Sequence, residues 1–276
     1  MASKPNLAKT KLLVLFSDLH VGSTTALFPE GFITKTGNGI LLNPYQKWLL
    51  ACWHEAQRYV AKVCAEDPYG LVLNGDVIEG IHHKTTQIVS ASVEDQFSAA
   101  IKLLEPVVQK ADYTFMVNGT ECHTGDLEDS IAGVLEAVKN PETKRHSFDR
   151  LTLDIHGVRC VFRHHIAGAT RRSLAASALG VQLAEEQVEA ALNGEKVPSV
   201  ICAAHRHKFS WYEDESGLCL VTPPWQLLTR HGHKVVSAAR TKCGVVILDW
   251  RGLPIGSKPR VHSLIFGTPQ PKAISL

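Results

Sequence analysis

The sequence has no apolar run approaching the roughly 20 residues that a membrane-spanning helix needs, and no small-residue cleavage site follows its short N-terminal apolar stretch. It also has no internal repeat, no low-complexity tract and no linker rich in glycine, serine or proline. We therefore expect a soluble, cytoplasmic protein that forms a single domain over residues 1–276, with residues 1–9 and about 255–276 as terminal extensions.

Neither sign of charge dominates, and the cysteines lack the spacing of a zinc ribbon. The formal net charge of +2 is too small to predict a protein that coats nucleic acid or a membrane by charge alone. The seven cysteines lie singly, mostly in apolar segments, and none forms a CxxC pair, so we expect reduced core thiols. With 45% apolar and 20% charged residues, the composition is that of an ordinary globular protein.

What the sequence does contain is a series of short apolar segments that each end in potential metal ligands. Such segments predict buried strands, and loops at the carboxyl ends of strands are where α/β sheets build their sites. Residues 12–16 precede Asp18 and His20, residues 71–73 precede Asp76, and residues 113–117 precede the polar cluster 118–123. Residues 158–162 precede His164 and His165, and residues 200–204 precede His205 and His207.

The remaining pattern predicts an α/β (α+β) fold. Helices are expected from Asn43 to about 67, from Ser92 onward behind a Ser92/Asp95 capping box, over 125–138 and over 174–192. Residues 151–155 and 158–162 form a hairpin, while 209–212, 218–221 and 244–250 are expected as strands of a second sheet. The last 20 or so residues are expected as a tail on the surface.

Similar short motifs occur elsewhere in the chain, but without a preceding buried strand. Asp154 and His156 repeat the DxH spacing inside the hairpin, and His231 and His233 repeat the HxH spacing after polar residues. Position at a strand end therefore separates the candidate ligands from chance matches.

The ordered set DLH (18–20), GD (75–76), HH (164–165) and AHRH (204–207) resembles the motifs of the calcineurin-like metallophosphoesterase superfamily. The resemblance extends over about residues 10–250. It implies a four-layer αββα sandwich, in which two mixed β-sheets face each other with helices outside.

The resemblance also implies a dinuclear metal centre. Asp18, His20 and His207 would hold the first metal, Asp76 would bridge both, and His205 with His164 or His165 would hold the second. A mixed nitrogen and oxygen ligand set rich in histidine disfavours Mg²⁺, so Mn²⁺ is the first expectation, with Fe or Zn²⁺ as alternatives. Extended backbone at 205–207 would project His205 and His207 to one side, so that each imidazole reaches one of two adjacent ions.

The third motif departs from the family pattern of GNH followed by an acid, because this chain has NGTECH at 118–123. Asn118 is one candidate for the missing amide ligand, Thr120 occupies its aligned position if Gly119 is the family glycine, and Glu121 offers a carboxylate. His123 is the histidine available as general acid. Two alternatives stay open for His123, namely ligation of the second metal and capping of the helix that follows.

His82, His83 and Arg206 are candidate substrate-binding residues, with a surface role as the alternative.

The expected function is hydrolysis of a phosphate ester through a hydroxide shared by two metals, with a phosphodiester such as a nucleotide or nucleic acid favoured. A phosphomonoesterase or protein phosphatase, and a non-catalytic metal-binding scaffold, are the alternatives. No membrane partner is expected, and the sequence does not determine the oligomeric state.

Overall fold

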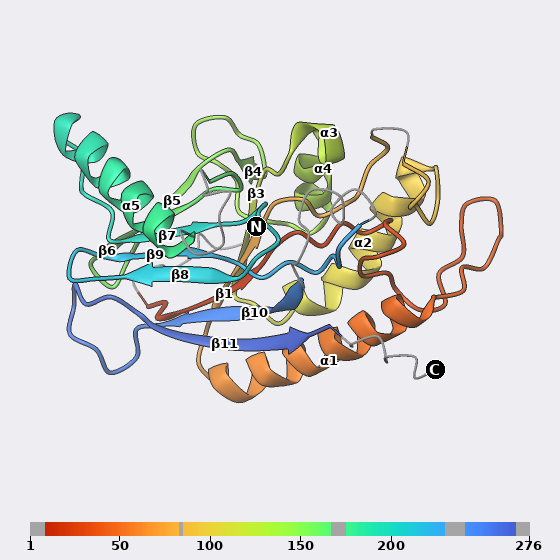
Figure 1. Cartoon of the computed structure of the whole chain (residues 1–276), viewed down its shortest axis with the longest axis horizontal. Helices are drawn as coiled ribbons and strands as arrows, with labels where there is room; N and C mark the ends of the chain where they lie inside the picture. Colours follow the sequence, from red (N-terminus) through yellow and green to blue (C-terminus); the bar gives the residue numbers. More distant parts are fainter. Residues whose placement is uncertain (1–8, 83–84, 167–174, 230–240, 269–276) are drawn as a thin grey trace, which may run out of the picture.

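The computed structural model describes residues 9–82, 85–166, 175–229 and 241–268 (Figure 1). His83, His231 and His233 lie outside these ranges. Eleven strands in the described ranges form two sheets, and the described helices are α1 (Pro44–Cys64), α2 (Val93–Val108), α3 (Glu121–Thr124), α4 (Leu127–Val134) and α5 (Ala175–Leu192).

The first sheet has six strands, with β1 near its centre. Within it, β1, β2, β3 and β4 run parallel to one another, and β10 is antiparallel to both β1 and β11. Their order across the sheet is β11 (Arg260–Gly267), β10 (Lys242–Asp249), β1 (Leu12–Phe16), β2 (Gly70–Asn74), β3 (Tyr113–Val117) and β4 (Ser147–Phe148).

The second sheet has five strands and is also mixed. The pairs β6–β7 and β7–β9 are parallel, whereas β5 and β8 run antiparallel to their neighbours. The order is β5 (Leu151–Ile155), β6 (Val158–Phe162), β7 (Val200–Ala203), β9 (Leu218–Val221) and β8 (Ser210–Glu213). The expected hairpin at His156 and Gly157 is confirmed, because β5 and β6 pair in register across it.

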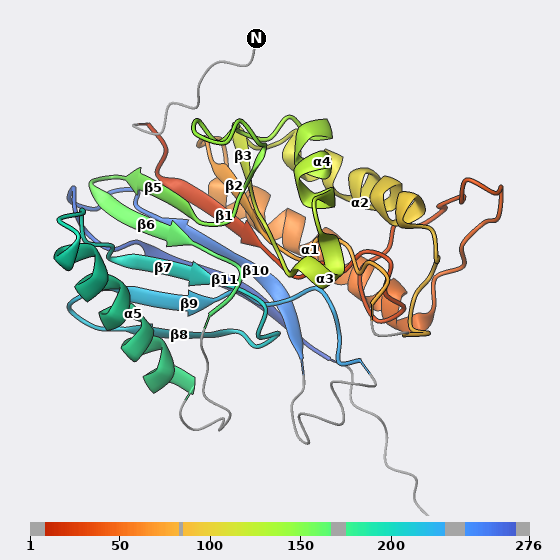
Figure 2. The same ribbon diagram turned by 90° about the horizontal axis from the view of Figure 1, so that it is seen from above.

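Alternation along β1 shows how the centre of the first sheet is buried on both faces. Successive side chains of a strand point to opposite faces, and all five residues of β1 are buried. Leu12, Val14 and Phe16 pack in the core under α1 and α2, whereas Leu13 and Leu15 pack between the two sheets. Continuous apolar strands of this kind therefore fit the centre of a sandwich (Figure 2).

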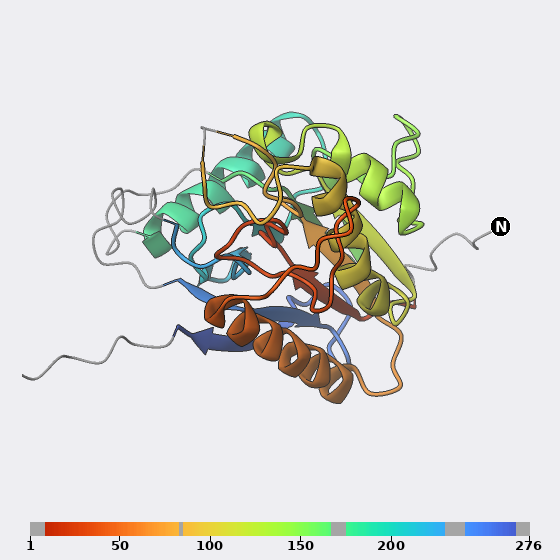
Figure 3. The same ribbon diagram turned by 90° about the vertical axis from the view of Figure 1, so that its right-hand side faces the viewer.

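The helices complete a four-layer arrangement. Residues of α1, α2 and α4 pack on the outer face of the first sheet, and Leu179 and Leu183 of α5 pack on the outer face of the second. Figure 3 shows α1 and α5 on opposite sides of the sheets. The expected αββα sandwich is thus confirmed. No helix within the described ranges is long and apolar enough to cross a membrane.

The predicted helix starts are confirmed by their caps. Asn43 accepts a hydrogen bond from Gln46 N at 3.0 Å, and Gln46 Oε1 accepts one from Asn43 N, which completes a capping box. Ser92 Oγ accepts from Asp95 N at 3.2 Å at the start of α2. The helix predicted over 125–138 is shorter, and a separate turn, α3, precedes it.

Two predictions for the C-terminal part are wrong. The strand at 244–250 belongs to the first sheet, where β10 pairs with β1, because a strand buried on both faces carries no pattern that selects one sheet. Residues 260–267 were expected in a surface tail but form the edge strand β11, which pairs with β10 along its whole length. Its half-buried side chains gave a weaker signal than those of the central strands.

Leu15→Ala should destabilise the protein by about 2–5 kcal/mol, because it removes a fully buried side chain from the core between the sheets. Leu41, which is 94% exposed, is the matched control, and Leu41→Ala should change the free energy of unfolding by less than about 0.5 kcal/mol. Equilibrium unfolding in urea measures both. Equal losses in the two variants would contradict the two-faced burial of β1.

Candidate metal centre

The candidate ligands follow strands of both sheets at one edge of the sandwich. Asp18 follows β1 and Asp76 follows β2, which run parallel in the first sheet, whereas His164 follows β6 and His205 follows β7, which run parallel in the second. Figure 2 shows the ends of these strands converging near the middle of the molecule. The arrangement brings together residues up to 189 positions apart, from Asp18 to His207.

Five of the candidate ligands have left-handed backbone conformations. The φ angles are 50° at Asp18, 46° at His20, 52° at Asp76, 67° at His205 and 46° at His207. Non-glycine residues adopt this region rarely and at an energetic cost, and such residues concentrate at functional sites. The expectation of extended backbone at 205–207 is therefore wrong. The loops turn sharply once the strands end, and this turn aims the side chains.

Asp18, His20 and His207 form the first group, and their ligating atoms lie within 4.8 Å of one another. His20 Nε2 lies 3.1 Å from His207 Nε2, and His207 Nε2 lies 3.4 Å from Asp18 Oδ1. Asp18 is fully buried, and its Oδ2 has no hydrogen-bond donor within the described ranges. A buried carboxylate oxygen beside two facing imidazole nitrogens fits a shared divalent cation.

Asp76 and His164 connect this group to the next. Asp18, Asp76 and His164 themselves form a group within 4.8 Å, with His164 Nε2 at 2.9 Å from Asp76 Oδ2. His164 Nδ1 donates to the backbone carbonyl of Asn74 at 2.8 Å, so Nε2 is the nitrogen that faces Asp76 and is placed to ligate a cation. Gly75 makes this approach possible, because a side chain there would clash with the His164 ring.

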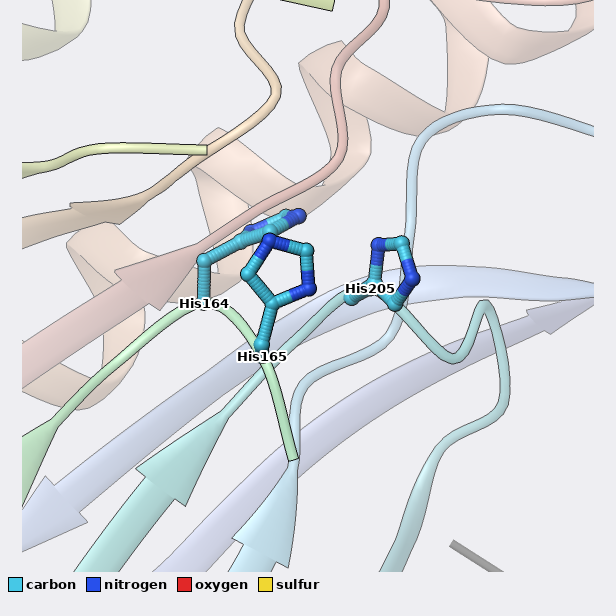
Figure 4. A group of neighbouring side chains, drawn as sticks. All are labelled: His164, His165 and His205. Atoms are coloured by element: carbon cyan, nitrogen blue, oxygen red, sulfur yellow. The ribbon is translucent and has the colours of Figure 1, made fainter. Parts of the chain in front are cut away.

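His164, His165 and His205 form the second group (Figure 4). The rings of His165 and His205 lie 4.4 Å apart between centroids, and those of His164 and His205 lie 5.3 Å apart. His164 is buried against Asp76, whereas His165 is exposed. The geometry therefore favours His164 over His165 as the ligand next to Asp76, although both belong to the group.

The protonation of these groups follows from their neighbours. Burial opposes the charge on Asp76, but His164 and His20 beside it lower its pKa below the ordinary value. Burial likewise opposes protonation of His164, yet Asp76 and Asp18 raise its pKa to about 9. Burial and the neighbouring His164 and His165 lower the pKa of His205 to about 4. At neutral pH, Asp76 and His205 thus have the forms that ligate cations.

In the third motif, Thr120 is the residue that contacts Asp76 and His205. Its backbone N donates to Asp76 Oδ1 at 2.6 Å, and its hydroxyl lies 3.2 Å from both Asp76 Oδ2 and His205 Nδ1. Asn118, by contrast, donates through its amide to Asp149 at 2.7 Å. Glu121 is exposed at the start of α3. A hydroxyl is therefore the side-chain group that this loop brings to Asp76 and His205.

His123 lies beside the first group. Its Nδ1 donates to the carbonyl of Glu79 at 2.8 Å, and its ring packs edge-on to His20 with centroids 4.8 Å apart. His82 also packs against His123, with ring centroids 4.1 Å apart. Arg206 is exposed between His205 and His207. His82 is thus part of the same cluster, and Arg206 lies at its rim.

Glu79 is the residue that the sequence analysis did not select. It is 3% exposed, and its carboxylate lies 2.9 Å from His20 Nδ1 and 3.0 Å from His82 Nε2 and accepts from Gln226 at 2.8 Å. A carboxylate behind a metal-binding histidine fixes the tautomer and orientation of the ring. The sequence signal for Glu79 is its place three residues after Asp76, within the same loop.

Two mixed sheets lie face to face, and candidate ligands follow strands of both at one edge. The fold is the four-layer αββα sandwich that the sequence resemblance implies. No family model and no curated protein matches this chain.

Several solved structures are similar in fold. A novel archaeal phosphodiesterase is 10% identical, with a TM-score of 0.45 over 92% of this chain and 99% of that one. Vps29 from Entamoeba histolytica in complex with Zn²⁺ is 10% identical, with a TM-score of 0.40 over 93% and 98%. A predicted phosphoesterase from Streptococcus pneumoniae is 10% identical, with a TM-score of 0.34 over 92% and 98%. The function of this protein is therefore inferred from its site residues and not from these structures.

Asp76→Asn should reduce the metal bound after incubation with Mn²⁺ to under one ion per chain, because it removes a negative charge from the group of Asp18, Asp76 and His164 that links the first group to the second. Elemental analysis of the desalted protein measures this. Asp154→Asn is the matched control from the hairpin, where Asp154 pairs with Arg159 and Lys196 instead. Full metal loading of Asp76→Asn would contradict the role of Asp76.

Proposed function

We propose that this protein is a metal-dependent phosphoesterase that uses two divalent cations, with Mn²⁺ as the first candidate and Fe or Zn²⁺ as alternatives. A phosphodiester is the favoured substrate. The observation that supports the proposal is the linkage of the ligand groups. The group of Asp18, Asp76 and His164 shares Asp18 with the first group and His164 with the second. Adjacent cation sites joined by carboxylates are the arrangement of two-metal phosphoryl chemistry.

The donor set fits such cations. It contains imidazole nitrogens and carboxylate oxygens without thiolates, which suits Mn²⁺, Fe or Zn²⁺. Asp18, His20 and His207 would hold one ion, His164 and His205 with the Thr120 hydroxyl or His165 would hold the other, and Asp76 would contact both. When bound, the ions would activate water and neutralise charge on the phosphate oxygens.

The protein's own residues would orient the substrate and move one proton. We assign His123 as general acid, because its Nδ1 donates to Glu79 O and its Nε2 is therefore the atom available to exchange a proton. We prefer Thr120 to Asn118 as a ligand because the Thr120 hydroxyl lies 3.2 Å from Asp76 Oδ2. The amide nitrogen of Asn118 pairs with Asp149, and its buried Oδ1, which has no hydrogen-bond donor among the described residues, is the alternative ligand. His82 beside His123 and Arg206 at the rim are the candidates for contact with the ester.

The preference for a diester rests on the same neighbourhood. His82, which packs against His123, offers a contact for a second ester substituent beside the leaving group that His123 would protonate. A nucleotide or nucleic acid is the substrate class that this predicts. The alternatives, a phosphomonoesterase and a non-catalytic scaffold, are separated by the following assay.

The Mn²⁺-loaded protein should hydrolyse bis(p-nitrophenyl) phosphate with a higher kcat/KM than p-nitrophenyl phosphate, because the site is proposed to accept a diester. Release of nitrophenolate measures both rates, and Asp76→Asn supplies the blank. Turnover of the monoester alone would refute the diesterase assignment. A chain that binds under one metal and stays inert toward both esters would be a scaffold.

His123→Ala should lower kcat by about 10²–10⁴-fold for a diester with an alkoxide leaving group and far less for one with nitrophenolate, because only the poorer leaving group needs a proton. Metal content should stay unchanged. His146→Ala is the control, since His146 bonds to Ala137 O, away from the groups. Loss of a metal ion from His123→Ala would instead make His123 a ligand.

A further inference from the structure

Glu128, in the first turn of α4, is a fully buried acid that follows no strand and belongs to none of the ligand groups. Burying a carboxylate is costly unless hydrogen-bond donors surround it. Its position in the interior therefore calls for a specific role.

The carboxylate joins two loops of the candidate metal centre from behind. Oε1 accepts from Val77 N at 3.0 Å, while Oε2 accepts from Gly119 N and from the Thr124 hydroxyl, the latter at 3.3 Å. Val77 directly follows Asp76, and Gly119 directly precedes Thr120. One side chain thus ties the loop after β2 to the loop after β3.

The relative position of these two loops determines the geometry at Asp76. Thr120 donates to both oxygens of Asp76, through its backbone N and its hydroxyl. Gly119 lies so close that a side chain there would clash with the backbone of Asp76. Asp76 also has a left-handed backbone with a φ of 52°, a conformation that persists only where its surroundings enforce it.

We propose that Glu128 is a positioning residue of the dinuclear centre, which clamps Val77 and Gly119 together and so fixes Asp76 and Thr120 for the two cations. The inference rests on the proposed function, because it assumes that cations bind at Asp76. Glu128 itself contacts neither the cations nor the substrate. It acts through the backbone of the two loops.

The same helix offers a matched control for a purely structural role. Asp129 Oδ1 accepts from His146 N at 2.6 Å and from Ser147 N and Oγ at 3.0 Å. Asp129 thus also joins α4 to a backbone segment through a carboxylate, but that segment leads into β4 and not to a ligand. Variants of the two residues separate loss of stability from loss of metal geometry.

The test is Glu128→Gln against Asp129→Asn. Glutamine has one acceptor oxygen, so either Val77 N or Gly119 N loses its acceptor and faces an NH₂ group. We expect the affinity for the more weakly bound Mn²⁺ to fall about 10–100-fold in Glu128→Gln, as for other residues that support metal ligands. Asp129→Asn should bind Mn²⁺ like the wild type, even if its unfolding temperature falls. Calorimetric titration measures affinity, and the spin-coupled electron paramagnetic resonance signal of paired Mn²⁺ measures geometry.

Wild-type affinity and an unchanged coupled signal in Glu128→Gln would overturn the proposal, and so would an equal loss of affinity in Asp129→Asn. If Glu128→Gln does not fold, Glu128→Asp is titrated instead. Its carboxylate is one methylene shorter and cannot reach both loops, so the same loss is expected. A wild-type chain that binds two Mn²⁺ ions but hydrolyses no ester would refute the proposed function and leave this inference standing. One that binds none would refute both.

Discussion

The carboxylate of Asp76 is the contact on which the candidate metal centre depends. It meets His164 from the second sheet at 2.9 Å, accepts from Thr120 in the loop after β3, and lies 3.6 Å from His20 in the loop after β1. Three separate chain segments thus converge on one side chain at the junction of the two sheets. A change in the packing of the sheets would separate His164 from the first-sheet ligands.

The packed strands of the two sheets hold the ligand loops in their left-handed conformations. The strands before the loops are buried on both faces, so their ends are fixed by close packing on both sides. Directly after them the backbone enters left-handed conformations at Asp18, Asp76 and His205, which packed strands and backbone hydrogen bonds hold in place. Asp18 N, for example, donates to Gly75 O, and His20 N donates to Asp76 O, each at 2.9 Å. The ligand loops therefore support one another.

Two further acidic side chains support the ligands and belong to none of the ligand motifs. Glu79 lies behind His20 and beside His82, and Glu128 lies behind the backbone next to Asp76 and Thr120. Glu79 has as its sequence signal only its place three residues after Asp76, and Glu128 follows no predicted strand. Their burial, at 3% and 0% exposed, is the property that marks them, and burial is a product of the whole fold.

The sequence by itself determined the strand-helix order, the two capped helix starts, and the strand-end position of Asp18, Asp76, His164 and His205, because apolar runs and capping residues act locally. Tertiary structure alone decided that β10 joins the first sheet, that residues 260–267 pair as β11, and that Thr120 rather than Asn118 faces Asp76. It also placed His164, and not His165, against Asp76, since a shift of one residue turns a side chain to the opposite face. Pairing partners and the direction of a loop depend on contacts between residues far apart in the chain, and no local pattern encodes them.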